Sequence, residues 1–261
     1  MRIVRFTPGP DAELGTDPLF GVLEDDGLIS IISGDPIYSG IQKTAARIEL
    51  NKVRLLAPVI PRSKVVCIGK NYSDHAAEMG GKVPEEPLIF LKPNTSVIGP
   101  QDTIVWPEMS EQVDHEVELA IVIGRICKDV PKERVSDVIF GYTIANDVTA
   151  RDLQKKDGQW ARAKSFDTFC PVGPWIETEF VPGTQKLTAT VDGQIKQSAQ
   201  LSDMIFDVPT IVNFVSRVMT LLPGDIILTG TPAGIGPMVI GGKVSVAIEG
   251  LGELTNKVAA Q

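Results

Sequence analysis

The sequence predicts a mixed α+β protein in which strands predominate. Most apolar residues occur in short stretches, where they either alternate with polar residues or form a continuous run. These stretches end at glycine, proline or Asp-Gly turns, as strands do. One well-defined amphipathic helical pattern follows Asp207. The length of 261 residues is enough for one large core, or for a core and a small further domain. We therefore predict a small β-rich N-terminal domain at residues 1–57 and a larger domain at residues 58–261.

The N-terminal segment contains a series of short strand patterns. Residues 2–6 alternate between apolar and polar, and the Asp25-Asp26-Gly27 turn between residues 20–24 and 28–32 is typical of a β-hairpin. Two prolines then interrupt an extended stretch at residues 56–61, which we interpret as the linker to the second domain.

The second domain combines strands with a few short helices. Strands are expected at residues 64–69, 87–93, 114–124, 138–147, 187–191, 194–196, 243–249 and 253–258, and residues 224–236 are expected to be a strand that runs into a glycine-rich loop. Helices are expected from Ser73 to the Gly80-Gly81 pair, from Asp129 to Val138, from a capping box at residues 149–152 to Gly158, and after Asp207.

Composition excludes several classes of function. The net charge of −8 argues against nucleic acid or an anionic membrane surface as a partner. No apolar run predicts a transmembrane helix, and we expect no signal peptide. The three cysteines are widely spaced, which favours reduced thiols and a cytoplasmic location. With only two histidines in the chain, a metal ion would be held mainly by oxygen, as Mg²⁺, Mn²⁺ and Ca²⁺ are.

Two glutamates at the head of an apolar strand are the first candidate metal ligands. Glu116 and Glu118 are two apart, so both point to the same face of a strand. Like charges in one partly buried place are costly unless a cation neutralises them. Taken alone, this pair is more typical of a solvated strand end than of a metal site, but the later strand delivers a third carboxylate, Asp147, at its C-terminal end.

A histidine and a glutamate form a candidate general base. His75 and Glu78 are three apart on a short helix and therefore share a face. A carboxylate beside an imidazole orients the ring and raises its basicity. The alternative is an incidental polar pair on a surface helix. The glycines that end this helix also make the segment a candidate lid.

Three further segments hold candidates for substrate binding and catalysis. Arg151 and Gln154 share a face of the helix that ends near Gly158. Lys164 lies between small and aromatic residues. The loop that begins with Gly230 and Thr231 is rich in glycine, which lets backbone N–H groups approach an anion, although its spacing matches neither a dinucleotide fingerprint nor a P-loop.

Five motifs, taken together and in this order, resemble the fumarylacetoacetate hydrolase family. The resemblance extends from residue 64 to about residue 258 and is greatest to the acylpyruvase and oxaloacetate decarboxylase branch. The motifs are GKNYSDHAAEM at residues 69–79, DHEVEL at 114–119, NDVTARDLQ at 146–154, AKSF at 163–166 and GDIILTGTP at 224–232.

The resemblance implies a β-roll catalytic domain, a homodimer, and one Mg²⁺ or Mn²⁺ ion per subunit. It assigns the metal to Glu116, Glu118 and Asp147, and catalysis to His75, Glu78 and Lys164. Gln154 and Thr231 match substrate-contacting positions, and we add Arg151 and Gly230 as candidates. Many members have an aromatic residue where this chain has His115, which we interpret as a packing or supporting residue and not as a ligand.

Three functions follow as hypotheses. The first is metal-dependent cleavage of a C–C bond in acylpyruvate-type 2-oxo acids such as fumarylpyruvate or acetylpyruvate, together with decarboxylation of oxaloacetate. The second is the family's 2-hydroxyhepta-2,4-diene-1,7-dioate isomerase and 5-oxopent-3-ene-1,2,5-tricarboxylate decarboxylase activity in aromatic catabolism. The third is a catalytically silent metal-binding β domain, which the complete set of acid, base and lysine residues argues against.

Overall fold

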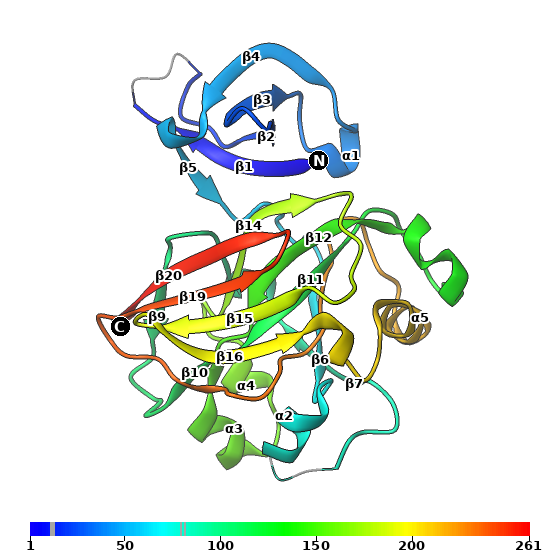
Figure 1. Ribbon diagram of the computed structural model, residues 1–261, viewed down its shortest axis with the longest axis vertical. Helices are drawn as coiled ribbons and strands as arrows, with labels where there is room; N and C mark the ends of the chain where they lie inside the picture. The colour runs from blue at the N-terminus through cyan, green and yellow to red at the C-terminus, as the bar shows by residue number, and fades with distance from the viewer. Residues whose placement is uncertain (11–13, 79, 81) are drawn as a thin grey trace.

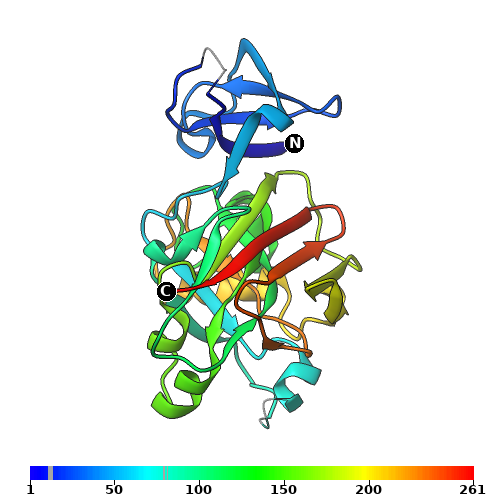
Figure 2. The same cartoon turned by 90° about the vertical axis from the view of Figure 1, so that its left-hand side faces the viewer.

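The protein, described here by a computed structural model for residues 1–10, 14–78, 80 and 82–261, consists of two stacked parts (Figure 1). The N-terminal part lies at one end of the long axis, and all later elements form the larger part beneath it (Figure 2). The elements of the N-terminal part are β1 (Arg2–Pro8), β2 (Leu19–Leu23), β3 (Leu28–Ile32), α1 (Pro36–Ser39), β4 (Lys43–Glu49) and β5 (Val53–Leu56).

The larger part contains fifteen strands and four α-helices among the described residues. Its elements up to α4 are β6 (Val65–Gly69), α2 (Ser73–Glu78), β7 (Leu88–Lys92), β8 (Val97–Ile98), β9 (Thr103–Trp106), β10 (Val113–His115), β11 (Val117–Ile123), β12 (Ile139–Asn146), β13 (Thr149–Ala150), α3 (Arg151–Asp157) and α4 (Ala161–Lys164). The remaining ones are β14 (Cys170–Glu177), β15 (Lys186–Val191), β16 (Gln194–Gln200), α5 (Val208–Val218), β17 (Ile226–Leu228), β18 (Gly236–Pro237), β19 (Lys243–Ile248) and β20 (Gly252–Ala260).

One long sheet joins the two parts. Its strand order is β4-β3-β2-β1-β14-β12-β11-β17-β6-β7, with β5 paired to β1 and β8 paired to β14. The pairing between the parts is short, since β1 contacts β14 only at Arg2 with Glu177 and Ile3 with Ile176. A five-stranded sheet in the order β16-β15-β19-β20-β9 and a three-stranded sheet in the order β13-β10-β18 complete the larger part. The expected mixed, β-rich fold is confirmed.

Strand β11 is the central wall of the larger part, because both of its faces are buried. Val117, Leu119, Ile121 and Ile123 point into the core shared with the five-stranded sheet and α5. Ala120 and Val122 point into a second core, which also contains residues of the N-terminal part. Burial on both faces explains why the strand is continuously apolar after Glu118. The carboxylates at its head are therefore held on a rigid element.

The structure corrects three expectations about the elements. The strand expected at residues 114–124 is interrupted at Glu116, and its first piece, β10, belongs to a different sheet. The expected capping box at residues 149–152 is absent from this part of the described chain, because Thr149 is in β13 and its hydroxyl donates to a carboxylate. The helix expected from Asp129 is a 3₁₀ helix that begins at Lys132, after Pro131.

Other expectations about local structure are confirmed. The Asp25-Asp26-Gly27 hairpin joins β2 to β3, Asp207 caps α5, and α3 ends at Gly158 in the left-handed conformation. The short helix α2 begins at Ser73, whereas Gly81, the second of the two expected terminating glycines, lies outside the described residues. The domain boundary between residues 57 and 58 stays a prediction. Among the described residues, no helix is long and apolar enough to span a membrane.

Candidate metal centre and active site

Three carboxylates from two neighbouring strands converge in the interior. Glu116 lies between β10 and β11, Glu118 is in β11, and Asp147 follows the end of β12. One oxygen atom of each side chain lies within 4.8 Å of the others, and all three residues are buried. The register explains this convergence, because antiparallel pairing of Val117 with Asn146 brings the start of β11 against the end of β12.

The interruption of the strand at Glu116 also has a structural cause. The backbone N–H of Glu116 donates to the Asn146 side-chain oxygen at 2.9 Å, and its carbonyl accepts from the N–H of Asp147 at 2.9 Å. The backbone groups of Glu116 are therefore satisfied outside a regular ladder, which lets β10 leave the sheet. This change of direction turns Glu116 toward Asp147.

Two buried lysines balance the carboxylates. The Lys164 ammonium group donates to Glu116 at 2.7 Å and to Asp147 at 2.6 Å. The Lys92 ammonium group donates to the other oxygen of Asp147 at 2.5 Å and to the carbonyl of Val148 at 3.1 Å. Asp147 is therefore held through both oxygens, one by each lysine. A buried charge is tolerated only with such partners.

Arg151 forms a second set of ion pairs behind Glu116. Its guanidinium group donates to Asp114 at 2.8 Å, to Gln154 at 2.5 Å, and to Glu116 in a short contact. Because the Gln154 oxygen accepts from Arg151, the NH₂ group of this amide is oriented away from the guanidinium. The predicted pair Arg151 and Gln154 thus lies beside the carboxylates, on one face of α3.

The carboxylates have opposite electrostatic environments. Burial would raise the pKa of Glu116, but the positive charges of Lys164 and Arg151 outweigh it and hold this pKa below its usual value. Burial, followed by the negative charges of Asp147 and Glu116, raises the pKa of Glu118 well above its usual value. Without a further cation, Glu118 is the carboxylate whose charge is least compensated.

The predicted His–Glu pair is formed on α2. His75 Nδ1 lies 3.0 Å from Glu78 Oε2, and His75 is buried whereas Glu78 is on the rim. The other oxygen of Glu78 accepts from the N–H of Gly234 at 3.0 Å. This contact joins the end of α2 to the glycine-rich loop that follows β17, so the helix is held over the site.

The same loop contacts a candidate metal ligand. The N–H of Gly230 donates to Glu118 at 2.6 Å. Gly230 has φ +96°, and a Cβ atom there would lie 2.7 Å from the Cβ of Asn71, so the close approach requires glycine. Thr231, the next residue, lines the site with its side chain buried.

Eight of the ten predicted site residues line one small cavity, and the other two each contact one of the eight, Glu78 contacting His75 and Gly230 contacting Glu118. The cavity has a volume of ≈ 20 Å³, enough for an ion or a water molecule but not for a 2-oxo acid. Substrate entry therefore requires the lining to move. The eight residues are His75, Glu116, Glu118, Asp147, Arg151, Gln154, Lys164 and Thr231.

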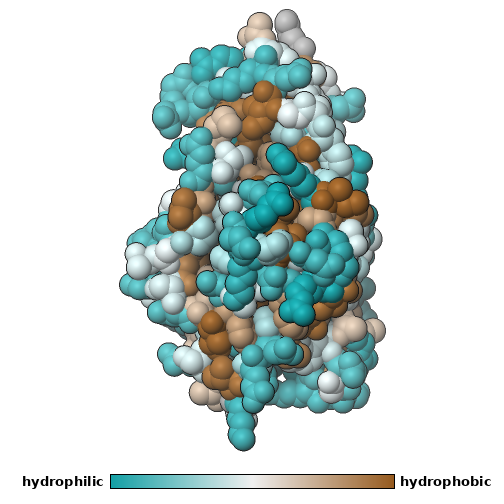
Figure 3. Space-filling view, turned by 90° about the vertical axis from the view of Figure 1, so that its right-hand side faces the viewer, coloured by the Kyte–Doolittle hydropathy of each residue, from teal (hydrophilic) through white to brown (hydrophobic). Residues whose placement is uncertain are grey.

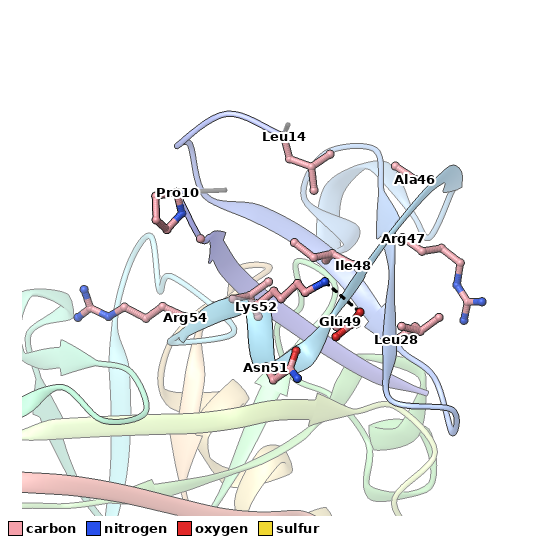
Figure 4. Close-up of a pocket in the computed structure, with 12 residues that line it drawn as sticks. Pro10, Leu14, Leu28, Ala46, Arg47, Ile48, Glu49, Asn51, Lys52 and Arg54 are labelled. Carbon is pink, nitrogen blue, oxygen red and sulfur yellow. Dashed lines mark hydrogen bonds and ion pairs between the residues drawn. The ribbon is translucent and has the colours of Figure 1, made fainter. Parts of the chain in front are cut away.

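A much larger hollow lies away from this chemistry. It has a volume of ≈ 910 Å³ and is lined by residues of the N-terminal part, including Leu28, Ile48 and Arg54 (Figure 4). Among the described residues that line it, Glu49 is the one carboxylate, and it is paired with Lys52. We therefore place the candidate active site at the three carboxylates and not at this larger hollow.

The donors suit a hard divalent cation. All three are carboxylate oxygens, which Mg²⁺, Mn²⁺ and Ca²⁺ prefer, and they are buried and close together. Glu118 accepts one hydrogen bond within the described residues, from Gly230, and so keeps lone pairs for an ion. His115 is not among these three close donors, and its Nδ1 lies 3.1 Å from the Gln197 side-chain oxygen.

The sequence reasoning missed three residues near the site. Lys92 has a weak signal, since a lysine in a strand of otherwise apolar residues needs a buried partner. Trp160 lines the cavity and packs edge-on against Phe90, with 5.2 Å between the centroids of the two rings. Gln197 is in a hairpin far along the chain, and no local pattern identifies it. Only the tertiary structure brings these three to the carboxylates.

Comparison with known proteins identifies the family. Residues 64–259, which are more than half of the chain, match the family described as fumarylacetoacetate (FAA) hydrolase C-terminal. The chain belongs to the fumarylacetoacetate hydrolase family. Residues 1–58 match a second family, described as Rv2993c-like, N-terminal. The expected family membership is confirmed.

Two curated relatives in this family cover most of the chain. Protein Rv2993c of Mycobacterium tuberculosis is 59% identical over 228 residues, which are 86% of this chain and 84% of the relative. The mitochondrial oxaloacetate tautomerase Fahd2a of Rattus norvegicus is 43% identical over 219 residues, which are 80% of this chain and 70% of the relative. The second name supports the oxaloacetate decarboxylase-like branch of the fumarylacetoacetate hydrolase family.

Solved structures in the family have the same fold over the whole chain. The 5-carboxymethyl-2-hydroxymuconate delta-isomerase of Mycobacterium smegmatis is 48% identical, with a TM-score of 0.90 and 100% coverage of both chains. The maleylpyruvate hydrolase of Sphingobium sp. SYK-6, in complex with manganese(II) ion and pyruvate, is 32% identical, with a TM-score of 0.80 and coverage of 100% of this chain and 99% of that one. The named family members thus include isomerases, tautomerases and hydrolases.

Proposed function

We propose that the protein is a divalent-metal-dependent enzyme that cleaves a C–C bond of acylpyruvate-type 2-oxo acids and also decarboxylates oxaloacetate. Acylpyruvates such as fumarylpyruvate or acetylpyruvate would yield pyruvate and a second acid. One observation carries the proposal: three buried carboxylates, a buried lysine and a His–Glu pair line or adjoin one cavity. A catalytically silent domain would have no need for this combination.

The proposed metal ion is Mg²⁺ or Mn²⁺, held by Glu116, Glu118 and Asp147. When bound, the ion would supply Lewis-acid stabilisation of negative charge on the oxygens of a 2-oxo acid. The buried, all-oxygen donor set supports this assignment. Further support is that a family neighbour, the maleylpyruvate hydrolase, was solved with manganese(II) and pyruvate.

His75 is the proposed general base for hydrolysis. Its Nδ1 faces Glu78, which leaves Nε2 to remove a proton from water while Glu78 stabilises the charged ring. The water oxygen adds to the distal acyl carbon, and the C–C bond between this carbon and C3 of the pyruvate unit then breaks. The electron pair goes to C3, which takes up a proton, so that acylpyruvate and water give pyruvate and a carboxylic acid.

Other residues of the cavity bind and orient the substrate in this proposal. Burial lowers the pKa of Lys164, but Asp147 and Glu116 outweigh it and keep this pKa raised, so Lys164 is a permanent positive charge beside the substrate oxygens. Gln154 presents its side-chain NH₂ group to the substrate as a hydrogen-bond donor. Arg151 is engaged with the acidic groups and holds them in place.

The test is turnover on acetylpyruvate, fumarylpyruvate, oxaloacetate and a hydroxyheptadienedioate, each with Mg²⁺, with Mn²⁺ and with EDTA. We expect pyruvate release from the acylpyruvates that EDTA abolishes. His75→Ala should lower hydrolytic kcat by roughly 10²–10⁴-fold, the usual effect of removing a general base. Asp74→Ala, which alters an exposed residue of the same helix, is the matched control. Full hydrolytic turnover by His75→Ala would contradict the role of this residue.

A second candidate function is isomerisation or tautomerisation of a related 2-oxo acid. It is favoured by the names of relatives, an oxaloacetate tautomerase and a delta-isomerase. The same base would then move a proton between two carbon atoms in an isomerisation, or between a carbon and an oxygen atom in a keto–enol tautomerisation, and no water would be consumed. Incubation in D₂O separates the two functions. Deuterium incorporation at C3 without release of pyruvate would identify the enzyme as an isomerase or tautomerase.

We also propose that the protein is a homodimer, as the family resemblance implies, and that it is cytoplasmic, as its three widely spaced cysteines indicate. On the face drawn in Figure 3, apolar side chains form several separate patches between hydrophilic ones. Sedimentation velocity at micromolar concentration tests the proposal directly. A single species of about twice the 28.1 kDa chain mass is expected, and a monomer at all concentrations would contradict it.

A further inference from the structure

We infer that Gln197 is a positioning residue that fixes the Thr231 hydroxyl as a hydrogen-bond donor toward the substrate. Gln197 is in β16, where its neighbours Lys196 and Ser198 are exposed, yet it is 1% exposed itself. The inference rests on the proposed function, because it assumes that the substrate presents a carboxylate or ketone oxygen to Thr231.

The Gln197 side chain is fully satisfied. Its oxygen accepts from the Val117 N–H at 3.0 Å and lies 3.1 Å from His115 Nδ1. Its NH₂ group donates to Thr231 Oγ1 at 2.8 Å and to the Pro232 carbonyl at 2.8 Å. The amide therefore connects the head of β11 to the glycine-rich loop.

Backbone groups determine the orientation of this amide. The Val117 N–H can only donate, so it requires the oxygen of Gln197, and the Pro232 carbonyl can only accept, so it requires the NH₂ group. The side chain cannot be flipped without losing both contacts. His115 must then carry its proton on Nδ1, because it faces the same oxygen.

The orientation of the amide determines what Thr231 offers the substrate. Because Gln197 donates to Thr231 Oγ1, the hydroxyl proton of Thr231 points elsewhere. Among the described residues, no protein acceptor takes this proton, and Thr231 lines the cavity between the carboxylates and His75. Thr231 thus presents a donor to the cavity, and a substrate oxygen with negative charge is its complement.

Two backbone features bring Gln197 to this position. The register of β15 and β16 shifts between Ala189 and Thr190, so Lys196 is an extra residue that redirects the strand. Gly234, with φ +96°, lies directly against the carbonyl of Lys196, where a Cβ atom would overlap it. The loop and the hairpin therefore pack backbone to backbone, which places the amide between them.

The test is a double-mutant cycle with Gln197→Glu and Thr231→Val in the Mn²⁺-loaded protein. The carboxylate in Gln197→Glu keeps the acceptor for Val117 but has no NH₂ group, so it draws the Thr231 proton away from the cavity. We expect each variant to raise KM for an acylpyruvate, and Kd for pyruvate by calorimetry, about 10-fold with kcat changed less than about 3-fold. The double variant should be no worse than either single one.

A control variant, two control measurements and a replacement variant keep the inference falsifiable. Gln194→Glu adds the same charge at an exposed position of the same strand and should change neither constant. Mn²⁺ affinity and the circular dichroism spectrum should match the wild type in every variant. If Gln197→Glu does not fold, Gln197→Met replaces it in the cycle, since it removes both donors without adding a buried charge.

The outcomes distinguish this inference from the proposed function. Pyruvate binding with a non-additive cycle, but no turnover of any substrate, would contradict the proposed function and support the role of Gln197. If the wild type turns over substrate but Gln197→Glu leaves KM unchanged, the role of Gln197 alone is overturned. The same conclusion follows if the increases in KM of the two single variants multiply in the double variant. A Mn²⁺-loaded wild type that neither binds pyruvate nor turns over a 2-oxo acid overturns both.

Discussion

At the scale of single residues, Glu116 and Glu118 look equivalent in the sequence, but the structure gives them different energetics. Glu116 is bound by Lys164, Arg151 and the Thr149 hydroxyl, whereas the Glu118 side chain accepts one hydrogen bond within the described part of the chain, from a backbone N–H. Removing a well-paired buried charge leaves its partners uncompensated and typically costs about 3–5 kcal/mol. Removing a poorly paired one relieves a desolvation penalty.

The first prediction contrasts these two carboxylates. In EDTA, Glu116→Gln should lower the free energy of unfolding by a few kcal/mol, because Lys164 and Arg151 lose a charged partner. Glu118→Gln should leave it unchanged or raise it, since the amide oxygen can still accept from Gly230. Both variants should lose the rise in Tm that Mn²⁺ gives the wild type. Urea denaturation and thermal melts measure these quantities, and equal destabilisation by both variants would contradict the assignment.

The second prediction concerns pH and metal affinity. Burial and the neighbouring carboxylates raise the pKa of Glu118, so below that pKa a cation must displace a proton from the metal-free site. Protons then compete with the ion, and affinity for Mn²⁺ should therefore rise as pH increases toward that pKa. Calorimetry in two buffers with different ionisation enthalpies measures the released proton. The wild type should release more than Glu118→Gln does.

At the scale of elements, the loop from Gly230 to Gly236 connects a candidate metal ligand, the His–Glu pair and a candidate substrate contact. It donates to Glu118 through Gly230, to the Glu78 side chain through Gly234, and pairs with β10 through β18. It also holds Thr231 against Gln197. A displacement of this loop would therefore disturb the metal ligand, the general base and the substrate contact together.

The third prediction tests that connection with two glycines. Gly234→Ala should displace the loop, because its Cβ atom overlaps the Lys196 carbonyl, and should lower kcat/KM by more than about 10-fold through loss of the Glu78 contact. Gly241→Ala is the control, since Gly241 has a similar φ of +87° but open space around its Cβ position. It should cost about 1–2 kcal/mol of stability and leave kcat/KM unchanged. Equal kinetic effects in both variants would contradict the connection.

The elements also show how far the sequence reasoning extends. Period-two patterns and Asp-Gly turns predicted most strands and hairpins, because these depend on neighbours in the chain. The interruption at Glu116 and the role of Thr149 were missed, since each depends on a strand or side chain distant in sequence. The carboxylates Glu116 and Glu118 and the His–Glu pair could be predicted, because their spacings place each pair on one face of a strand or of a helix. Lys92 and Gln197 reach the site only through tertiary packing, so no spacing reveals them.

At the scale of the whole molecule, two of the three cysteines lie in the interior. Cys67 and Cys170 are fully buried in the core that adjoins the N-terminal part, whereas Cys127 is partly exposed. Burial raises the pKa of the Cys170 thiol to about 12 and that of Cys67 well above its usual value. The thiolate is the reactive form, so both groups should be inert in the folded protein.

The fourth prediction follows from these thiols. A thiol-specific disulfide reagent at pH 8 should modify at most one cysteine of the native protein, Cys127, and all three after denaturation. Cys127→Ser is the control and should give no fast reaction. Rapid modification of Cys67 or Cys170 would show that the two parts separate readily, since their short pairing at Arg2 and Ile3 is the main backbone connection between them.

The burial of β11 on both faces also has a consequence for redesign. A strand that is the common wall of two cores tolerates few substitutions, so a library of variants aimed there would mostly yield unfolded protein. Changes of substrate range should instead be sought at Lys70 and Trp160, which line the cavity but belong neither to the three carboxylates nor to the His–Glu pair. The proposed metal ligands and the residues that can be varied thus lie on different elements, which makes the molecule a practical starting point for directed evolution.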